Sequence, residues 1–221
     1  MGDVRPEYAT LAEEFAKLAA PFGHSLADDI RRDIARLASA IERIDRIVDE
    51  ATNDDDRRAL WTSVVDRMRG KTNAIVPTDL RDGADELRAI GEERNVLARL
   101  RRIVAKEAKT SESMRVASTN AAFVPLVLRE GRLTAALALV IAGSACGPRF
   151  RRFFFRLGGP ANLVDKIKDA KGDHARGEIT LVPSPLLYLH LFGSLVLRSI
   201  GLMSAHPQPL SIVTLGLRYL R

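Results

Sequence analysis

The sequence predicts an all-α protein, and three observations support that prediction. Apolar residues recur at helical spacing over long stretches, no stretch has the alternation that marks a β-strand, and Ala, Leu, Arg and Asp dominate the composition. The 221 residues are enough for one domain with a substantial core. We therefore expect a single helical domain without internal repeats.

The first third of the chain contains three predicted helices, each bounded by Pro, Gly or a capping residue. They cover residues 7–19, 25–51 and 53–70. Ser25 and Asp28 resemble a capping box at the start of the second helix. Because the apolar residues of that helix keep helical spacing, we expect it to cross the core.

Three more helices are predicted in the middle of the chain, over residues 78–109, 111–128 and 134–146. The first is highly charged, which is typical of a solvated face. Pro125 should kink or break the second helix. The third is apolar nearly all round, so we expect it to be buried. Its small residues would allow close helix packing or leave room for a bulky apolar ligand.

The last part of the chain begins with a helix that we expect to start near Pro160. A short extended link over residues 178–183 follows, and then two apolar helices over 186–203 and 208–220. Residues 186–203 are apolar enough to suggest a membrane span. Because His190 and Arg198 interrupt them, a buried helix is the favoured interpretation.

Composition and charge narrow the function classes. The net charge of +6 suits an anionic substrate or membrane surface. The sequence has no zinc-ligand spacing, no interleaved aromatic-basic strip of the RNA-binding kind and no Gly-rich phosphate loop, so we expect no nucleic-acid partner. The only cysteine, Cys146, excludes an internal disulfide, and the amino terminus lacks a signal peptide. These features predict a cytoplasmic protein.

One stretch carries a pattern with chemical meaning. At about 100° per residue, Asp165, Asp169 and Asp173 fall on one narrow stripe of a helix. Stacked carboxylates repel one another unless a cation lies among them, and oxygen ligands alone favour Mg²⁺. Mg²⁺ completes its shell with water and substrate phosphates, and Arg176, one turn further, could clamp the same phosphate. The alternative is a solvated acidic face on a Lys-rich helix.

These residues resemble the second motif of the squalene/phytoene synthase branch of the class I isoprenoid synthases. That family has Asn, Asp and Asp at four-residue steps, then Arg-Gly and a later Leu-Pro. The chain has Asp165, Asp169 and Asp173, then Arg176-Gly177 and Leu181-Val-Pro183. It departs from the family at Asp165, where the family has Asn, and places Asn162 one turn earlier.

The family's first motif is an Asp-x-x-x-Asp helix far upstream. Asp45 and Asp49 resemble it and are followed by Arg57-Arg58, and Val140-Ile-Ala-Gly143 is similar to a Val-Ala-Gly segment before the second motif. Asp29 and Asp33 form a rival pair at the same spacing. Local context favours Asp45 and Asp49.

The resemblance implies an all-α, single-domain bundle of the isoprenoid synthase type with a central apolar cavity. The domain would span residues 1–221: an N-terminal helix over 1–23, a core with both acidic motifs over 24–183, and apolar helices over 184–221. It implies a Mg²⁺-dependent terpene synthase that ionises a prenyl diphosphate. The metal ligands and catalytic residues would be Asp45, Asp49, Asp165, Asp169 and Asp173, and the diphosphate-binding residues Arg176 and Lys166.

Two alternatives stay open beside the terpene synthase. One is a prenyltransferase of the squalene/phytoene synthase type, which joins prenyl diphosphates. The other is a non-catalytic helical protein that binds lipid or a membrane surface, with peripheral membrane contact through the arginines and phenylalanines of Arg149–Arg156. For that segment, the simpler expectation is Phe in the core with Arg at the rim.

Overall fold

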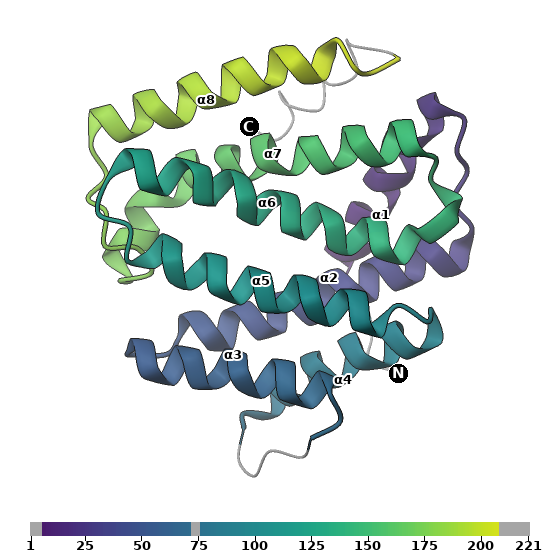
Figure 1. Ribbon diagram of the computed structural model, residues 1–221, viewed down its shortest axis with the longest axis horizontal. Helices are drawn as coiled ribbons and strands as arrows, with labels where there is room; N and C mark the ends of the chain where they lie inside the picture. Colours follow the sequence, from purple (N-terminus) through teal and green to yellow (C-terminus); the bar gives the residue numbers. More distant parts are fainter. Residues whose placement is uncertain (1–5, 72–75, 208–221) are drawn as a thin grey trace. The chain divides into compact units, whose positions relative to one another are not determined.

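Eight α-helices, two 3-10 helices and no β-strand make up residues 6–71 and 76–207, which the computed structural model describes (Figure 1). The α-helices are α1 (Pro6–Ala19), α2 (Asp28–Asp49), α3 (Asp54–Met68), α4 (Thr78–Glu93), α5 (Leu97–Arg115), α6 (Asn120–Ala142), α7 (Pro148–Ala175) and α8 (Pro185–Met203). The 3-10 helices are Ala20–Phe22 and Gly143–Ala145. The all-α prediction is confirmed for these residues, and the helix predicted at 208–220 lies outside them.

The first three helices agree with the predicted ranges, except at one cap. The side chain of Asn53 accepts a 2.8 Å hydrogen bond from the backbone N–H of Asp56 and so caps α3. The prediction of a capping box at Ser25 is wrong. Ala27 is the N-cap of α2, without a side-chain hydrogen bond, and Ser25 lies outside the helix.

The charged helix predicted over residues 78–109 is two helices in the structure, α4 and α5. Between them Asn95 has a φ of 54°, a left-handed conformation that ends a right-handed helix. Asn adopts this conformation more readily than most residues, and a single such Asn leaves little trace in the apolar spacing. The chain then continues as α5 to Arg115, beyond the predicted end.

The prolines and glycines of the last predicted helices do not break them. Pro125 lies inside α6, which continues to Ala142, so the separate helices predicted over 111–128 and 134–146 are wrong. Pro160 lies inside α7, which begins at Pro148.

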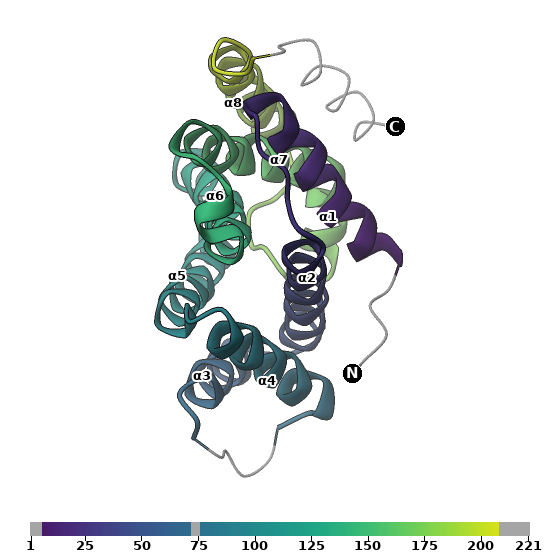
Figure 2. The same cartoon turned by 90° about the vertical axis from the view of Figure 1, so that its right-hand side faces the viewer.

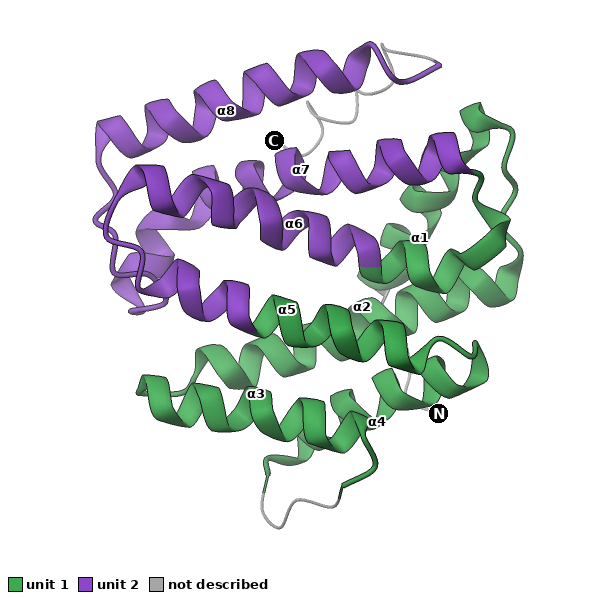
Figure 3. Cartoon of the chain, in the orientation of Figure 1, with its two compact units in different colours: residues 1–108, 137–147 green, residues 109–136, 148–221 purple. Residues whose placement is uncertain are grey.

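The described chain divides into two compact units (Figure 3). Unit 1 comprises residues 1–108 and 137–147, and unit 2 comprises 109–136 and 148–221, within the limits of the described residues. In unit 1, α2 packs against α1, α3 and α4, and α3 also packs against α4. The large side chains buried between α2 and α4 are Ile34, Leu37, Ile44, Leu80, Leu87 and Ile90.

Unit 2 has its own core, built from α6, α7 and α8. α8 lies along α7 (Figure 1, Figure 2). The core includes the buried residues Phe123, Val127, Leu128, Leu163, Ala170, Leu187 and Leu191. α6 and α7 approach closely at two glycines, since a Cβ on Gly131 would lie 2.1 Å from the carbonyl oxygen of Gly158. The Gly158-Gly159-Pro160 segment is therefore a helix contact, which is why the predicted helix start at Pro160 is wrong.

The expectation that residues 186–203 form a buried helix is wrong. These residues form the helix α8, but only 17% of its apolar stretch is buried in the structure. Of the described helices, it alone is long and apolar enough to cross a membrane by length and composition. Its first turn is capped by Ser184, whose side chain accepts a 3.2 Å hydrogen bond from the backbone N–H of Leu187.

Candidate functional site

The carboxylate stripe lies on the second half of α7, as the helical spacing predicts. Asp165 and Asp169 are exposed, whereas Asp173 is 2% exposed. The difference arises because Asp173 stands at the end of α7, where the chain turns back over it towards the buried Ile179. The stripe therefore contains two solvent-facing carboxylates and one buried carboxylate.

Asp173 is held between two cations. Its Oδ2 accepts a 2.7 Å hydrogen bond from Lys166 Nζ, and its Oδ1 accepts one of 2.8 Å from Arg176 Nη2. Arg176 also donates to Glu178 through Nε and Nη2. Burial of an unpaired carboxylate would be strongly unfavourable, and these two cations offset that cost. They are the two residues for which the family resemblance implies diphosphate binding.

Glu130 on α6 belongs to the same cluster, although no sequence pattern indicates it. Asn162 Nδ2 donates hydrogen bonds to Glu130 Oε2, at 2.8 Å, and to the carbonyl oxygen of Val127, at 2.9 Å. Burial raises the pKa of Glu130, and Asp173 and Asp165 raise it further, while Lys166 and the hydrogen bond from Asn162 act in the opposite direction. Only the contact between α6 and α7 brings Glu130 to this place, and no local spacing predicts that contact.

Lys166 occupies the centre of this cluster. Burial acts to lower its pKa, but Glu130, Asp173 and Glu178 outweigh burial, so the pKa of Lys166 is raised. A lysine in this position stays protonated at neutral pH and serves as a fixed positive charge. The side chain of Lys166 is only 18% exposed, so it is not a surface lysine.

The other two aspartates of the stripe influence each other. Burial raises the pKa of Asp165, and the charge of Asp169 raises it further, while Lys166 and Lys168 oppose both effects. Two carboxylates one helical turn apart repel each other, and a cation that binds both relieves the repulsion.

These side chains suit a magnesium ion only if the ion takes few ligands from the protein. Among residues 6–71 and 76–207, no group of three or more His, Cys, Asp or Glu side chains is placed to hold a metal. Mg²⁺ commonly takes one or two carboxylates and completes its shell with water and phosphate oxygens. Asp165 and Asp169 can supply those two carboxylates. Asp173 could join them only after it released Lys166 or Arg176.

The first predicted motif lies in unit 1, at the end of α2. Asp45 is half-buried, and Asp49 is exposed and is the last residue of the helix. The buried guanidinium of Arg57 donates hydrogen bonds of 3.1 Å to the carbonyl oxygens of Val48 and Asp49. These bonds satisfy carbonyls that a helix end otherwise leaves without partners. The two motifs belong to different units, so their joint role as metal ligands stays a prediction.

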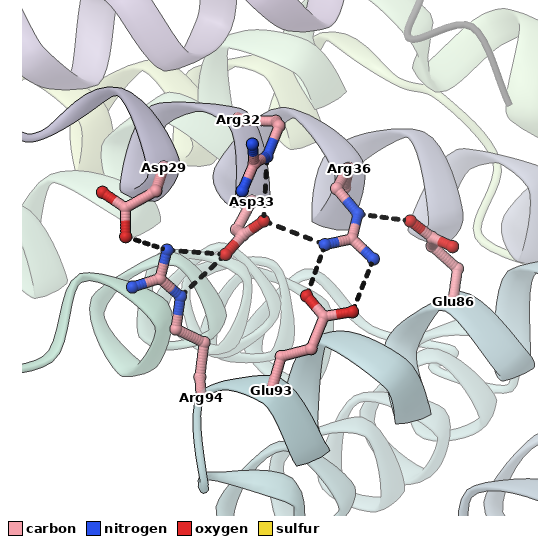
Figure 4. Close-up of polar contacts among 7 residues, drawn as sticks. All are labelled: Asp29, Arg32, Asp33, Arg36, Glu86, Glu93 and Arg94. Atoms are coloured by element: carbon pink, nitrogen blue, oxygen red, sulfur yellow. Dashed lines mark hydrogen bonds and ion pairs between the residues drawn. The ribbon is translucent and has the colours of Figure 1, made fainter. Parts of the chain in front are cut away.

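The rival pair, Asp29 and Asp33, is engaged in a structural ion-pair network (Figure 4). Arg94 donates to Asp33 Oδ2 at 2.7 Å and to Asp29 Oδ2 at 2.8 Å. Arg36 donates to Asp33 Oδ1 at 3.0 Å and binds carboxylates at the end of α4, including Glu93 at 2.7 Å. The hydrogen bond from Arg94 lowers the pKa of Asp29.

This network connects α2 to α4 and to the turn that follows α4. Both oxygens of the buried Asp33 already accept hydrogen bonds from arginine, which leaves little capacity for a metal. Asp29 and Asp33 are therefore committed to structural ion pairs, and the choice of Asp45 and Asp49 as the first motif stays a prediction.

The Arg149–Arg156 segment forms the first turns of α7. Phe150 and Phe153 are buried, whereas Arg149, Arg152 and Arg156 are exposed. The simpler sequence expectation, Phe in the core with Arg at the rim, is confirmed for these five residues. Phe155 differs, because its side chain is exposed beside the arginines.

No protein-family model, curated protein or solved structure matches the chain significantly. The described residues form an all-α protein with eight α-helices. Between α6 and α7 it has a cluster of Lys166 with the carboxylates of Glu130 and Asp173. The resemblance to isoprenoid synthases, which depends on the motif residues alone, stays a prediction.

Proposed function

We propose that this protein is a Mg²⁺-dependent class I terpene synthase, which ionises a prenyl diphosphate and releases diphosphate. The observation that carries the proposal is the pair of exposed carboxylates on adjacent turns of α7. Partial desolvation raises the pKa of Asp165, and the negative charge of Asp169 raises it further, as expected for crowded like charges. Such a pair suits a divalent cation that also binds substrate phosphates.

Under this proposal the cations of the cluster bind the diphosphate. Arg176 is 59% exposed, so its guanidinium can turn from Asp173 to a phosphate without moving the backbone. Lys166 stays between Glu130 and Asp173 and adds a fixed positive potential. Mg²⁺, when bound, would neutralise charge on the departing diphosphate.

The product depends on how the allylic cation is consumed. Loss of a proton gives a terpene, whereas attack on a second prenyl diphosphate gives the coupled product of a prenyltransferase. The short chain leaves less room for two long substrates, so the proposal is the synthase.

The proposal is tested first by ligand-dependent thermal stability. The protein is heated with inorganic diphosphate, with and without Mg²⁺, and its melting temperature is measured. We expect an increase that requires both ligands and that is lost in Asp165→Asn and Asp169→Asn. A bound ligand at a hundred times its dissociation constant stabilises the folded state by about 2.7 kcal/mol.

Asp82→Asn is the matched control. Asp82 is an exposed aspartate of α4, ion-paired with Arg81 at 3.3 Å, and its replacement changes the net charge by the same amount. It should keep the full Mg²⁺-dependent shift. An equal shift in all four proteins, or no shift in the unmodified chain, would contradict a diphosphate site on α7.

A further inference from the structure

α8 presents an unusual surface for a helix packed in a protein. One face carries six large apolar side chains with exposed fractions between 43% and 73%. They are Leu186, Leu189, Phe192, Val196, Leu197 and Ile200, called here the α8 stripe. Their three- and four-residue spacing places them in a row about 21 Å long, at a rise of 1.5 Å per residue. Exposed apolar patches of this kind mark an interaction surface.

The opposite side of α8 packs against the core of unit 2. Leu187 and Leu191 are fully buried in the core of unit 2, and Leu202 is buried nearer the helix end. The ring of His206, just beyond the helix, lies 4.9 Å from the ring of Phe153 on α7. α8 is therefore held along α7 with the stripe facing away from the core.

The sequence of α8 and of the first turns of α7 carries positive charge without acidic residues. The sequence contains no Asp or Glu after Glu178, and none between Glu130 and Asp165. Arg198 is the charged residue of α8, and the start of α7, which contacts the end of α8, exposes Arg149, Arg152 and Arg156. Arginines near an apolar surface favour an anionic environment, each contributing about 1 kcal/mol at a charged membrane.

We propose that the α8 stripe docks on the surface of an anionic lipid bilayer, with α8 parallel to the membrane plane. If α8 crossed the membrane, α7, which packs against its Leu187 side, would have to enter the bilayer with it, and the many charged residues of α7 make that costly. A helix with one face in the protein and one apolar face outside fits the interface instead.

A second copy of the chain is a poorer occupant than lipid. A two-fold interface brings the same surface together from both copies, so the arginines near the stripe would meet arginines rather than acidic partners. Anionic headgroups supply the missing negative charge. The proposal does not depend on the diphosphate chemistry proposed for α7.

The test uses the full chain and vesicle flotation. Vesicles are made of phosphatidylcholine alone or of phosphatidylcholine with phosphatidylserine, and the bound fraction is measured with increasing salt. We expect binding to the anionic vesicles that weakens with salt. Leu189→Gln/Leu197→Gln should reduce the partition coefficient at least about tenfold, because burial of one leucine is worth that factor.

The matched control is Leu11→Gln/Val116→Gln, which removes two exposed apolar side chains outside α8. It should bind like the unmodified chain. Arg152→Gln/Arg156→Gln should reduce the preference for anionic over neutral vesicles. All replaced side chains are exposed, and circular dichroism should report an unchanged fold in each variant.

Three results would overturn the proposal. The first is a folded chain that binds neither vesicle, as expected if another segment of the chain covers the stripe. The second is equal binding by the stripe variant and the control. The third is a dimer in solution that becomes monomeric in the stripe variant without any vesicle binding, which would assign the stripe to a second copy.

Discussion

Glu130 and Lys166 are a half-buried carboxylate and a half-buried ammonium on facing helices of unit 2. Burial raises the pKa of Glu130, so the folded protein holds a proton on this carboxyl at a pH where the unfolded chain has lost it. The unfolding free energy therefore falls, through this group, as the pH rises from the usual carboxyl pKa through the raised one. The partial compensation by Lys166 reduces this loss but does not reverse its sign.

Glu130→Gln should therefore become more stable relative to the unmodified protein as the pH rises from acid to neutral. The neutral amide keeps an oxygen that can accept the hydrogen bond from Asn162, and it avoids the burial of a negative charge. Urea unfolding at a series of pH values measures the difference. Glu92→Gln, which changes an exposed residue of α4, should not show this increase. A difference for Glu130→Gln that stays constant or decreases over the same range would refute the assignment.

At the scale of helices, the contact between α6 and α7 depends on two glycines. A Cβ on Gly131 would lie 2.1 Å from the carbonyl oxygen of Gly158, and one on Gly158 would lie 2.0 Å from that of Gly131. Backbone atoms cannot yield at these distances, so the helices would have to separate. The same contact positions Glu130 beside Asn162 and Lys166.

Gly131→Ala should destabilise the protein by about 1–3 kcal/mol, the usual range for overpacking a core. Gly193→Ala on α8 has the opposite expected sign, because a Cβ there meets nothing within 4 Å. Alanine in a helix interior is favoured over glycine by about 1 kcal/mol. Denaturant unfolding measures whether Gly131→Ala lowers the unfolding free energy and Gly193→Ala raises it. Equal effects would show that the contact does not limit the approach of the two helices.

Helix identity was easier to predict than helix boundaries. The apolar spacing of residues 25–51 and 53–70 predicts α2 and α3, since each buries one face and ends at a capping or turn residue. The apolar spacing does not predict the break at Asn95, because a single left-handed residue produces it. Local propensity predicts a helix start at Gly158-Gly159-Pro160, because it carries no information about the close approach of α6.

For the molecule as a whole, the sequence predicts the all-α class and places Asp165, Asp169 and Asp173 on successive turns of one helix. It does not predict that Asp173 is buried between Lys166 and Arg176, or that Glu130 completes the cluster, since both result from tertiary contacts. It also favoured burial of residues 186–203, because composition alone cannot distinguish a core helix from one that exposes its apolar face.

The most direct test of the proposed function is turnover by the purified chain. Allylic prenyl diphosphates of increasing length are incubated with and without Mg²⁺, diphosphate release is followed, and hydrocarbon products are identified by mass spectrometry. We expect Mg²⁺-dependent release that falls by at least about a hundredfold in Asp169→Ala, the usual scale for loss of a group that stabilises developing charge. Asp82→Ala should keep full activity. Absence of release from every substrate, or equal release by both variants, would contradict the proposed ionisation chemistry.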